Sequence, residues 1–148
     1  MYLKRFLVSV ISAVCLCASL GITVSAETAS AYSLVDIASP FYAVADQAYS
    51  DIEIVGNKAE CVSRAYGDQI VKITVEQTLE KYSGWFWIWN SVDGASWTKT
   101  INSNSILMSN TKSGLSSGTY RLKSVFTLTS SSGKTETITI YSAEKTVG

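Results

Sequence analysis

The chain has 148 residues, with 12 Lys and Arg, 12 Asp and Glu, and a formal net charge of zero. This length is typical of a single domain, and the neutral charge argues against nucleic acid as a partner. Because the sequence contains no histidine, Ser-His-Asp and Cys-His catalysis, histidine-ligated metals and histidine pH switches are excluded.

Residues 1–26 have the pattern of a secretory signal peptide. Lys4 and Arg5 precede an uncharged apolar stretch over 6–22, and Val24-Ser25-Ala26 supplies the small residues of a cleavage site. A membrane anchor is the alternative, but the stretch is at the short end of a bilayer span. A lipoprotein signal is disfavoured because bulky residues precede both cysteines of this stretch. We expect cleavage after Ala26 and a secreted, extracellular product without a membrane span.

After this cleavage, Cys61 is the one remaining cysteine, so no disulfide can form within the mature chain. Exported small domains often rely on disulfides, and this one would depend on its hydrophobic core, for which about 120 residues suffice. We predict that Cys61 is a buried small hydrophobe. A disulfide-linked dimer and a catalytic thiol are the alternatives, and we expect a monomer.

Residues 27–50 are interpreted as an N-terminal arm. Ser39-Pro40 has the form of a helix N-cap followed by proline at the first helical position. Apolar residues follow at helical spacing, namely Phe41, Val44, Ala45 and Ala48. This spacing predicts a short helix over 40–48.

Residues 51–148 are predicted to form an all-β domain. Apolar and polar residues alternate over 59–65, 71–80 and 120–128, and again over 137–141. Period two with one polar face is typical of half-buried strands. We therefore expect strands in which every second side chain faces the core.

Turn residues separate these strands. They are Gly56-Asn57, Gly67-Asp68, Ser83-Gly84, Asp93-Gly94 and the segment 130–133. The polar segment 98–117 is predicted to be a long loop with one short strand at Ile106–Met108. About seven strands with turns every 8–12 residues predict an antiparallel β-sandwich of two sheets.

The segment Gly118-Thr119-Tyr120-Arg121-Leu122 resembles the tyrosine corner of immunoglobulin-like sandwiches. Leu122 stands where such domains often have a cysteine, and the resemblance places Cys61 opposite it on the second strand. The cross-sheet disulfide and the tryptophan of the third strand are absent. The resemblance implies an immunoglobulin-like antiparallel β-sandwich of about seven strands and says nothing about function.

Five segments together resemble a group of short secreted β-sandwich proteins from Gram-positive anaerobic bacteria. The similarity covers about residues 51–146, and the family has no assigned activity, so it implies export and a β fold and carries over no site residue. The segments are Ala59-Glu60-Cys61, Ile73–Lys81, Trp85–Trp89, Gly118–Lys123 and Gly133–Glu136.

Catalytic and metal sites find little support in the sequence. Glu76 and Glu80 share a strand face, but strand rise separates them by about 13 Å, more than glycosidase carboxylates need. The four aspartates of residues 46–93 are dispersed. We expect no catalytic residue, no cofactor and no metal site, with a calcium ion between loops as an alternative.

The tryptophans are the candidate binding residues. On a strand over 85–89, Trp85, Trp87 and Trp89 would share one face, and Phe86 and Ile88 the other. The favoured interpretation is that at least two of the tryptophans pack in the core. The alternative is an exposed platform on which a glycan or a protein stacks, with a polar rim of Asn90, Lys99 and Asn102.

The sequence therefore predicts a secreted, non-enzymatic binding or interaction module at or beyond the bacterial surface. Its partner would be an unidentified extracellular glycan or protein. One alternative is a carbohydrate-binding module that uses the tryptophan row. A second is a hydrolase of unrecognised type.

Overall fold

The structure is a computed structural model that describes residues 42–148. The described region contains eight strands and no helix, which confirms the all-β prediction with one strand more than the expected seven. The strands are β1 (Gln47–Val55), β2 (Lys58–Tyr66), β3 (Ile70–Ser83), β4 (Ile88–Ile101), β5 (Ser105–Lys112), β6 (Gly118–Ser130), β7 (Thr135–Tyr141) and β8 (Lys145–Val147).

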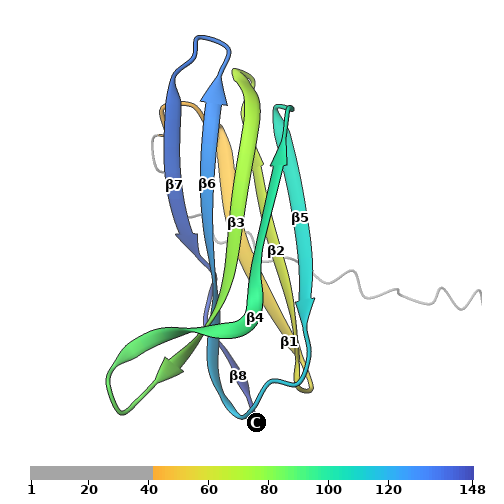
Figure 1. Cartoon of the computed structure of the whole chain (residues 1–148), viewed down its shortest axis with the longest axis vertical. Helices are drawn as coiled ribbons and strands as arrows, with labels where there is room; N and C mark the ends of the chain where they lie inside the picture. Colours follow the sequence, from red (N-terminus) through yellow and green to blue (C-terminus); the bar gives the residue numbers. More distant parts are fainter. Residues whose placement is uncertain (1–41) are drawn as a thin grey trace, which may run out of the picture. The chain divides into compact units, whose positions relative to one another are not determined.

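Two antiparallel sheets pack face to face (Figure 1). One has the order β1-β2-β5, and the other has the order β4-β3-β6-β7, with β8 paired to β6. In immunoglobulin constant domains the first, second and fifth strands share a sheet, and the third, sixth and seventh form the other. This chain has the same arrangement, except that β4 joins β3 instead of β5. The predicted immunoglobulin-like sandwich is confirmed.

The predicted tyrosine corner is present on β6. Tyr120 is buried, and its hydroxyl donates a hydrogen bond of 2.6 Å to the backbone carbonyl of Ser116. Leu122 and Cys61 lie in the same hydrophobic cluster, as the resemblance implied. Burial raises the pKa of Cys61 to about 12. The thiol therefore stays protonated at neutral pH, as the prediction of a small buried hydrophobe requires.

A layer of polar side chains divides the core into two hydrophobic clusters. On β3, Val75 belongs to one cluster and Leu79 to the other, and the buried Gln77 lies between them. The same order of apolar, polar and apolar side chains occurs on β2 and β6. We call this set the polar layer; it consists of Ser50, Ser63, Gln77, Asn110 and Ser124.

Hydrogen bonds join the polar layer across the two sheets. The Gln77 amide donates to the Ser63 hydroxyl at 2.6 Å and to the Met108 carbonyl at 3.2 Å, and it accepts from the Asn110 amide at 2.7 Å. Ser124 bonds the hydroxyls of Ser63 at 2.6 Å and Ser50 at 2.8 Å. A register shift of any of the five strands that carry the layer, β1, β2, β3, β5 and β6, would break some of these bonds, so the layer specifies the pairing of these strands as well as their packing.

The helix predicted over 40–48 is wrong in the part that the structure describes. β1 begins at Gln47, and residues 42–46 form an irregular segment. The backbone N–H groups of Ala43, Val44 and Ala45 donate to the Glu136 carboxylate at 2.8, 2.8 and 3.3 Å, which leaves them unavailable to a helix. Residues 1–41, with the predicted signal peptide and most of the arm, lie outside the described residues.

Glu136 makes the attachment of this segment dependent on pH. Burial by itself raises the pKa of Glu136, but the three backbone hydrogen bonds and the nearby charge of Lys134 outweigh it, so the pKa lies below its ordinary 4.5. A lowered folded-state pKa stabilises the protein above the unfolded value, and this stabilisation is lost as pH falls through the folded value. We expect the stability difference between wild type and Glu136→Gln, measured by urea unfolding, to be constant above pH 4.5 and to shrink below it. A difference independent of pH would contradict this assignment.

Two predicted loop features are also wrong. Asp93-Gly94 lies inside β4, at a bulge where the pairing with β3 jumps from Thr78 with Ser96 to Glu80 with Ser91. The segment 98–117 contains the end of β4 and all of β5, so the long loop is wrong, whereas the short strand predicted at Ile106–Met108 lies within β5. Both β4 and β5 are edge strands with one exposed, polar face, and this composition resembles that of a loop.

Candidate functional site: an aromatic hairpin tip

Four consecutive apolar side chains are exposed at the turn between β3 and β4. The exposed fractions are 85% for Trp85, 67% for Phe86, 82% for Trp87 and 47% for Ile88. Figure 1 shows this hairpin extending away from the other strands. We call residues 85–88 the aromatic tip. Neighbouring large apolar side chains with this exposure are typical of an interaction site.

The strand predicted over 85–89 is wrong, and with it the row of three tryptophans. Residues 84–87 form the turn, so Trp85 and Trp87 lie in neither a core nor a strand face. Only Trp89 belongs to a strand, where its ring packs against Tyr82 with 5.3 Å between the ring centroids. The favoured interpretation of core packing therefore fails for Trp85 and Trp87, and the flat platform is absent as well.

The predicted polar rim is not assembled. Asn90 lies on β4 near the hairpin tip. Lys99 lies towards the other end of β4, where its ammonium donates to the Leu107 carbonyl at 3.4 Å, and Asn102 lies just beyond that end. The structure thus brings one of the three rim residues close to the tip and separates the other two from it.

Trp87 has a backbone φ of +57°, and no other non-glycine residue of the region 42–148 has a positive φ. This conformation costs a non-glycine residue roughly 1–2 kcal/mol. We expect Trp87→Gly to raise the free energy of unfolding by about 1 kcal/mol in urea unfolding followed by circular dichroism. Trp85→Gly is the matched control, because Trp85 has an ordinary φ, and it should give no such gain. Equal effects of the two changes would contradict the strain.

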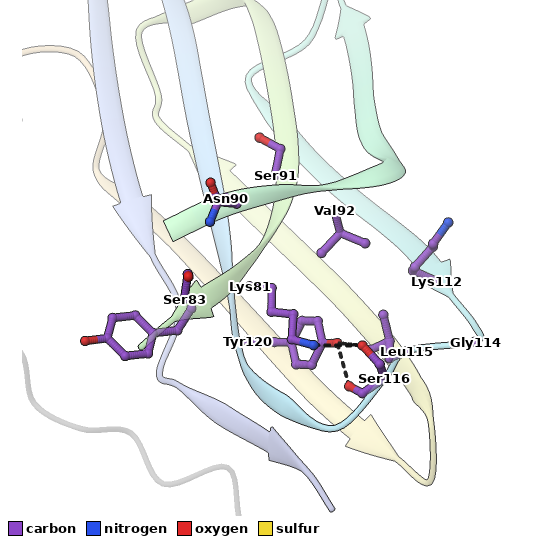
Figure 2. A pocket seen from close by; sticks show the side chains of 11 residues that line it. Lys81, Ser83, Asn90, Ser91, Val92, Lys112, Gly114, Leu115, Ser116 and Tyr120 are labelled. Atoms are coloured by element: carbon purple, nitrogen blue, oxygen red, sulfur yellow. Dashed lines mark hydrogen bonds between the residues drawn. The ribbon is translucent and has the colours of Figure 1, made fainter. Parts of the chain in front are cut away.

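A pocket of about 370 Å³ lies at the base of the hairpin (Figure 2). The Lys81 ammonium donates to the Ser116 hydroxyl at 2.7 Å and lies 5.5 Å from the centre of the Tyr120 ring. The Lys112 ammonium donates to the Asp93 carbonyl at 2.7 Å. No carboxylate side chain lines the pocket, whose residues are Lys81, Tyr82, Ser83, Asn90, Ser91, Val92, Lys112, Gly114, Leu115, Ser116 and Tyr120.

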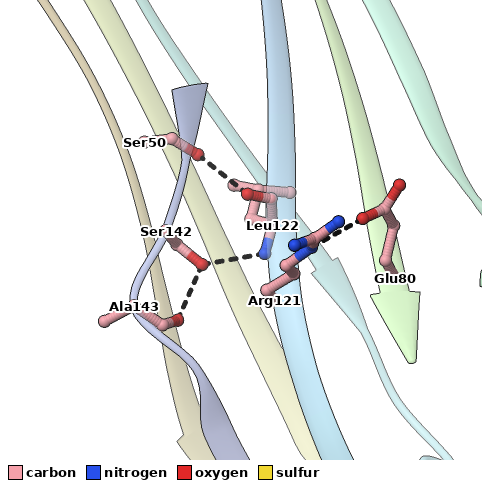
Figure 3. A network of polar contacts seen from close by, with 6 residues as sticks. All are labelled: Ser50, Glu80, Arg121, Leu122, Ser142 and Ala143. Carbon is pink, nitrogen blue, oxygen red and sulfur yellow. Dashed lines mark hydrogen bonds and ion pairs between the residues drawn. The ribbon is translucent and has the colours of Figure 1, made fainter. Parts of the chain in front are cut away.

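Arg121 contacts side chains of three neighbouring strands at the base of the hairpin. The sequence pattern did not predict this role. The Arg121 guanidinium lies 4.1 Å from the centres of both the Trp89 and the Tyr141 rings. Its Nε also donates to a Glu80 carboxylate oxygen at 2.8 Å (Figure 3). These contacts join β3, β4, β6 and β7, and we call Arg121, Glu80, Trp89 and Tyr141 the arginine clamp.

Neither a metal cluster nor a membrane helix is found in the described part of the chain. Within residues 42–148, no three His, Cys, Asp or Glu side chains come together as they would around a metal ion. The same residues contain no helix that is long and apolar enough to cross a membrane.

No family model and no curated protein matches the chain. Two crystal structures of wild-type OgpA from Akkermansia muciniphila are similar at 13% identity, with TM-scores of 0.37 and 0.39; the matches cover 70% and 75% of this chain and 30% and 32% of OgpA. This chain thus spans about a third of OgpA. The CARDB domain of the PF1109 protein from Pyrococcus furiosus, in complex with di-metal ions, is similar at 10% identity and a TM-score of 0.34, over 69% of this chain and 91% of that domain. With TM-scores this low, no argument about function rests on these likenesses.

Proposed function

We propose that the chain is an exported, non-enzymatic binding module whose contact surface is the aromatic tip. The exposure of Trp85, Phe86 and Trp87 at one turn carries this proposal. These side chains do not belong to the hydrophobic core, and Trp87 adopts a backbone conformation that disfavours folding. A feature that costs stability and adds no packing is best explained by a function outside the fold.

The size of the tip suffices for useful affinity. A tryptophan side chain buries 150–250 Å² on contact. At 25 cal/mol per Å², Trp85 and Trp87 together would contribute roughly 8 kcal/mol before the costs of association. The arginine clamp fixes the base of the hairpin. Less of the binding free energy is therefore spent on ordering the hairpin when the partner binds.

The double variant Trp85→Ser/Trp87→Ser tests the proposal. We expect the wild-type protein to sediment with cell-envelope preparations, and the double variant to bind at least about 100-fold more weakly because most of the contact area is removed. Both proteins should unfold at similar urea concentrations, since exposed side chains contribute little to stability.

Leu107→Ser is the matched control, because Leu107 is also a large exposed apolar residue but lies on β5. This variant should bind like the wild type. Full binding by the double variant would overturn the assignment of the tip, and equal weakening by Leu107→Ser would show non-specific adhesion.

A further inference from the structure

We infer that the partner of the aromatic tip is the interfacial region of a lipid bilayer, with a preference for anionic headgroups. This inference rests on the proposed function, since it names the partner of the same surface. It depends on the uncharged sequence of the hairpin, on its shape, and on two lysines that line the pocket at its base.

The tip has the composition of an interfacial membrane anchor. Tryptophan is enriched at the level of the lipid headgroups, where its apolar ring and its N–H group are both satisfied. Trp85, Phe86, Trp87 and Ile88 are exposed together, and no charged residue occurs between Lys81 and Asp93. The tip can therefore enter the interface without removing a charge from water, which would otherwise oppose insertion.

The shape of the hairpin also favours a bilayer. To bind a folded protein, a projecting turn needs a pocket of matching shape. To stack on a sugar ring, it needs a flat row of aromatic rings. That row is absent because Trp89 packs against Tyr82 and Arg121 and not beside the tryptophans of the turn. A fluid bilayer accepts a convex tip. Insertion of about 5–10 Å involves only the turn, where the Phe86 N–H already donates to the Ser83 carbonyl at 3.2 Å.

Two lysines line the pocket at the base of the hairpin. Lys81 lies on β3, two residues before the strand ends at Ser83, and it is the last charged residue before the tip. Lys112 borders the same pocket, which has no carboxylate lining. Basic side chains close to a bilayer surface attract anionic lipids.

The test uses sedimentation with vesicles of phosphatidylcholine, alone or mixed with phosphatidylglycerol. We expect wild type to bind both, with binding several-fold tighter on the anionic vesicles at low salt, and this preference should vanish at high salt. Bromine-labelled acyl chains should quench the fluorescence of the bound protein. Trp85→Ser/Trp87→Ser should weaken binding to both vesicles by about tenfold or more.

Paired lysine variants separate the electrostatic part. Lys81→Ala/Lys112→Ala should lose the preference for anionic vesicles and keep the binding to neutral ones. Lys72→Ala/Lys134→Ala, which removes two lysines near the opposite end of β3 and β6, should behave like wild type. Equal effects of the two pairs would overturn the preference for anionic headgroups.

Failure of this inference can be told apart from failure of the proposed function. One outcome is that wild type binds neither kind of vesicle and still sediments with lipid-extracted envelopes, while Trp85→Ser/Trp87→Ser does not. In that case the partner of the tip is a glycan or a protein and not the bilayer. If neither material is bound through the tip, both proposals are overturned.

Discussion

Replacing Gln77 by alanine is expected to lower the free energy of unfolding by about 3 kcal/mol. Gln77 is fully buried and joins Ser63, Asn110 and the Met108 carbonyl. Its removal leaves a cavity, and it also leaves the Asn110 amide and the Met108 carbonyl without this partner.

Urea unfolding of Gln77→Ala measures this loss. Glu76→Ala is the matched control, because the neighbouring side chain is exposed, and it should change the free energy by less than about 0.5 kcal/mol. Gln77→Leu separates the two terms: it fills the cavity but restores no hydrogen bond, so it should remain destabilised. A Gln77→Leu variant more stable than wild type would contradict the role given to the polar layer.

The second large effect is expected from Arg121→Ala, which should cost about 2–3 kcal/mol. The change leaves the Glu80 carboxylate, which is mostly buried, without its ion pair, and it removes the guanidinium that lies over the Trp89 and Tyr141 rings. Loss of one partner of a shielded ion pair costs more than the pair contributes, because the remaining charge has no compensation.

A double-mutant cycle with Glu80→Ala measures the coupling, which should be about 1–2 kcal/mol. Lys123→Ala is the control, since Lys123 follows on the same face of β6 but has no ion pair within the residues described. Additive effects of Arg121→Ala and Glu80→Ala would show that the clamp is not one unit.

The sandwich could be predicted because its central strands alternate regularly. On β2 and β6 every residue predicted to face the core is buried, and Gly56 has the positive φ of 62° that its hairpin turn requires. On β3 the alternation was also clear, but Val71 is exposed because a bulge between Ile70 and Lys72 shifts the pattern. The burial of Gln77 could not be predicted for a different reason. A polar side chain can be assigned to the core only when its hydrogen-bond partners on other strands are known.

The site was harder to predict because a turn and a strand can have the same sequence pattern. Trp85 to Trp89 alternates tryptophan with other apolar residues, which is typical of a strand. Whether such a segment pairs or turns depends on the length of β3 and on the register of β4, both of which are set by distant contacts. Arg121 likewise gained its role from cross-strand register, which places it opposite Glu80.

The most direct test of the aromatic tip places a photo-reactive phenylalanine analogue at Phe86 and, in a separate protein, at Leu107. Both positions are exposed, and only Phe86 lies in the tip. After illumination with cell envelopes, we expect covalent adducts from the Phe86 position, and few from Leu107. Adducts from both positions in equal yield, or from Leu107 alone, would contradict the tip as the contact surface.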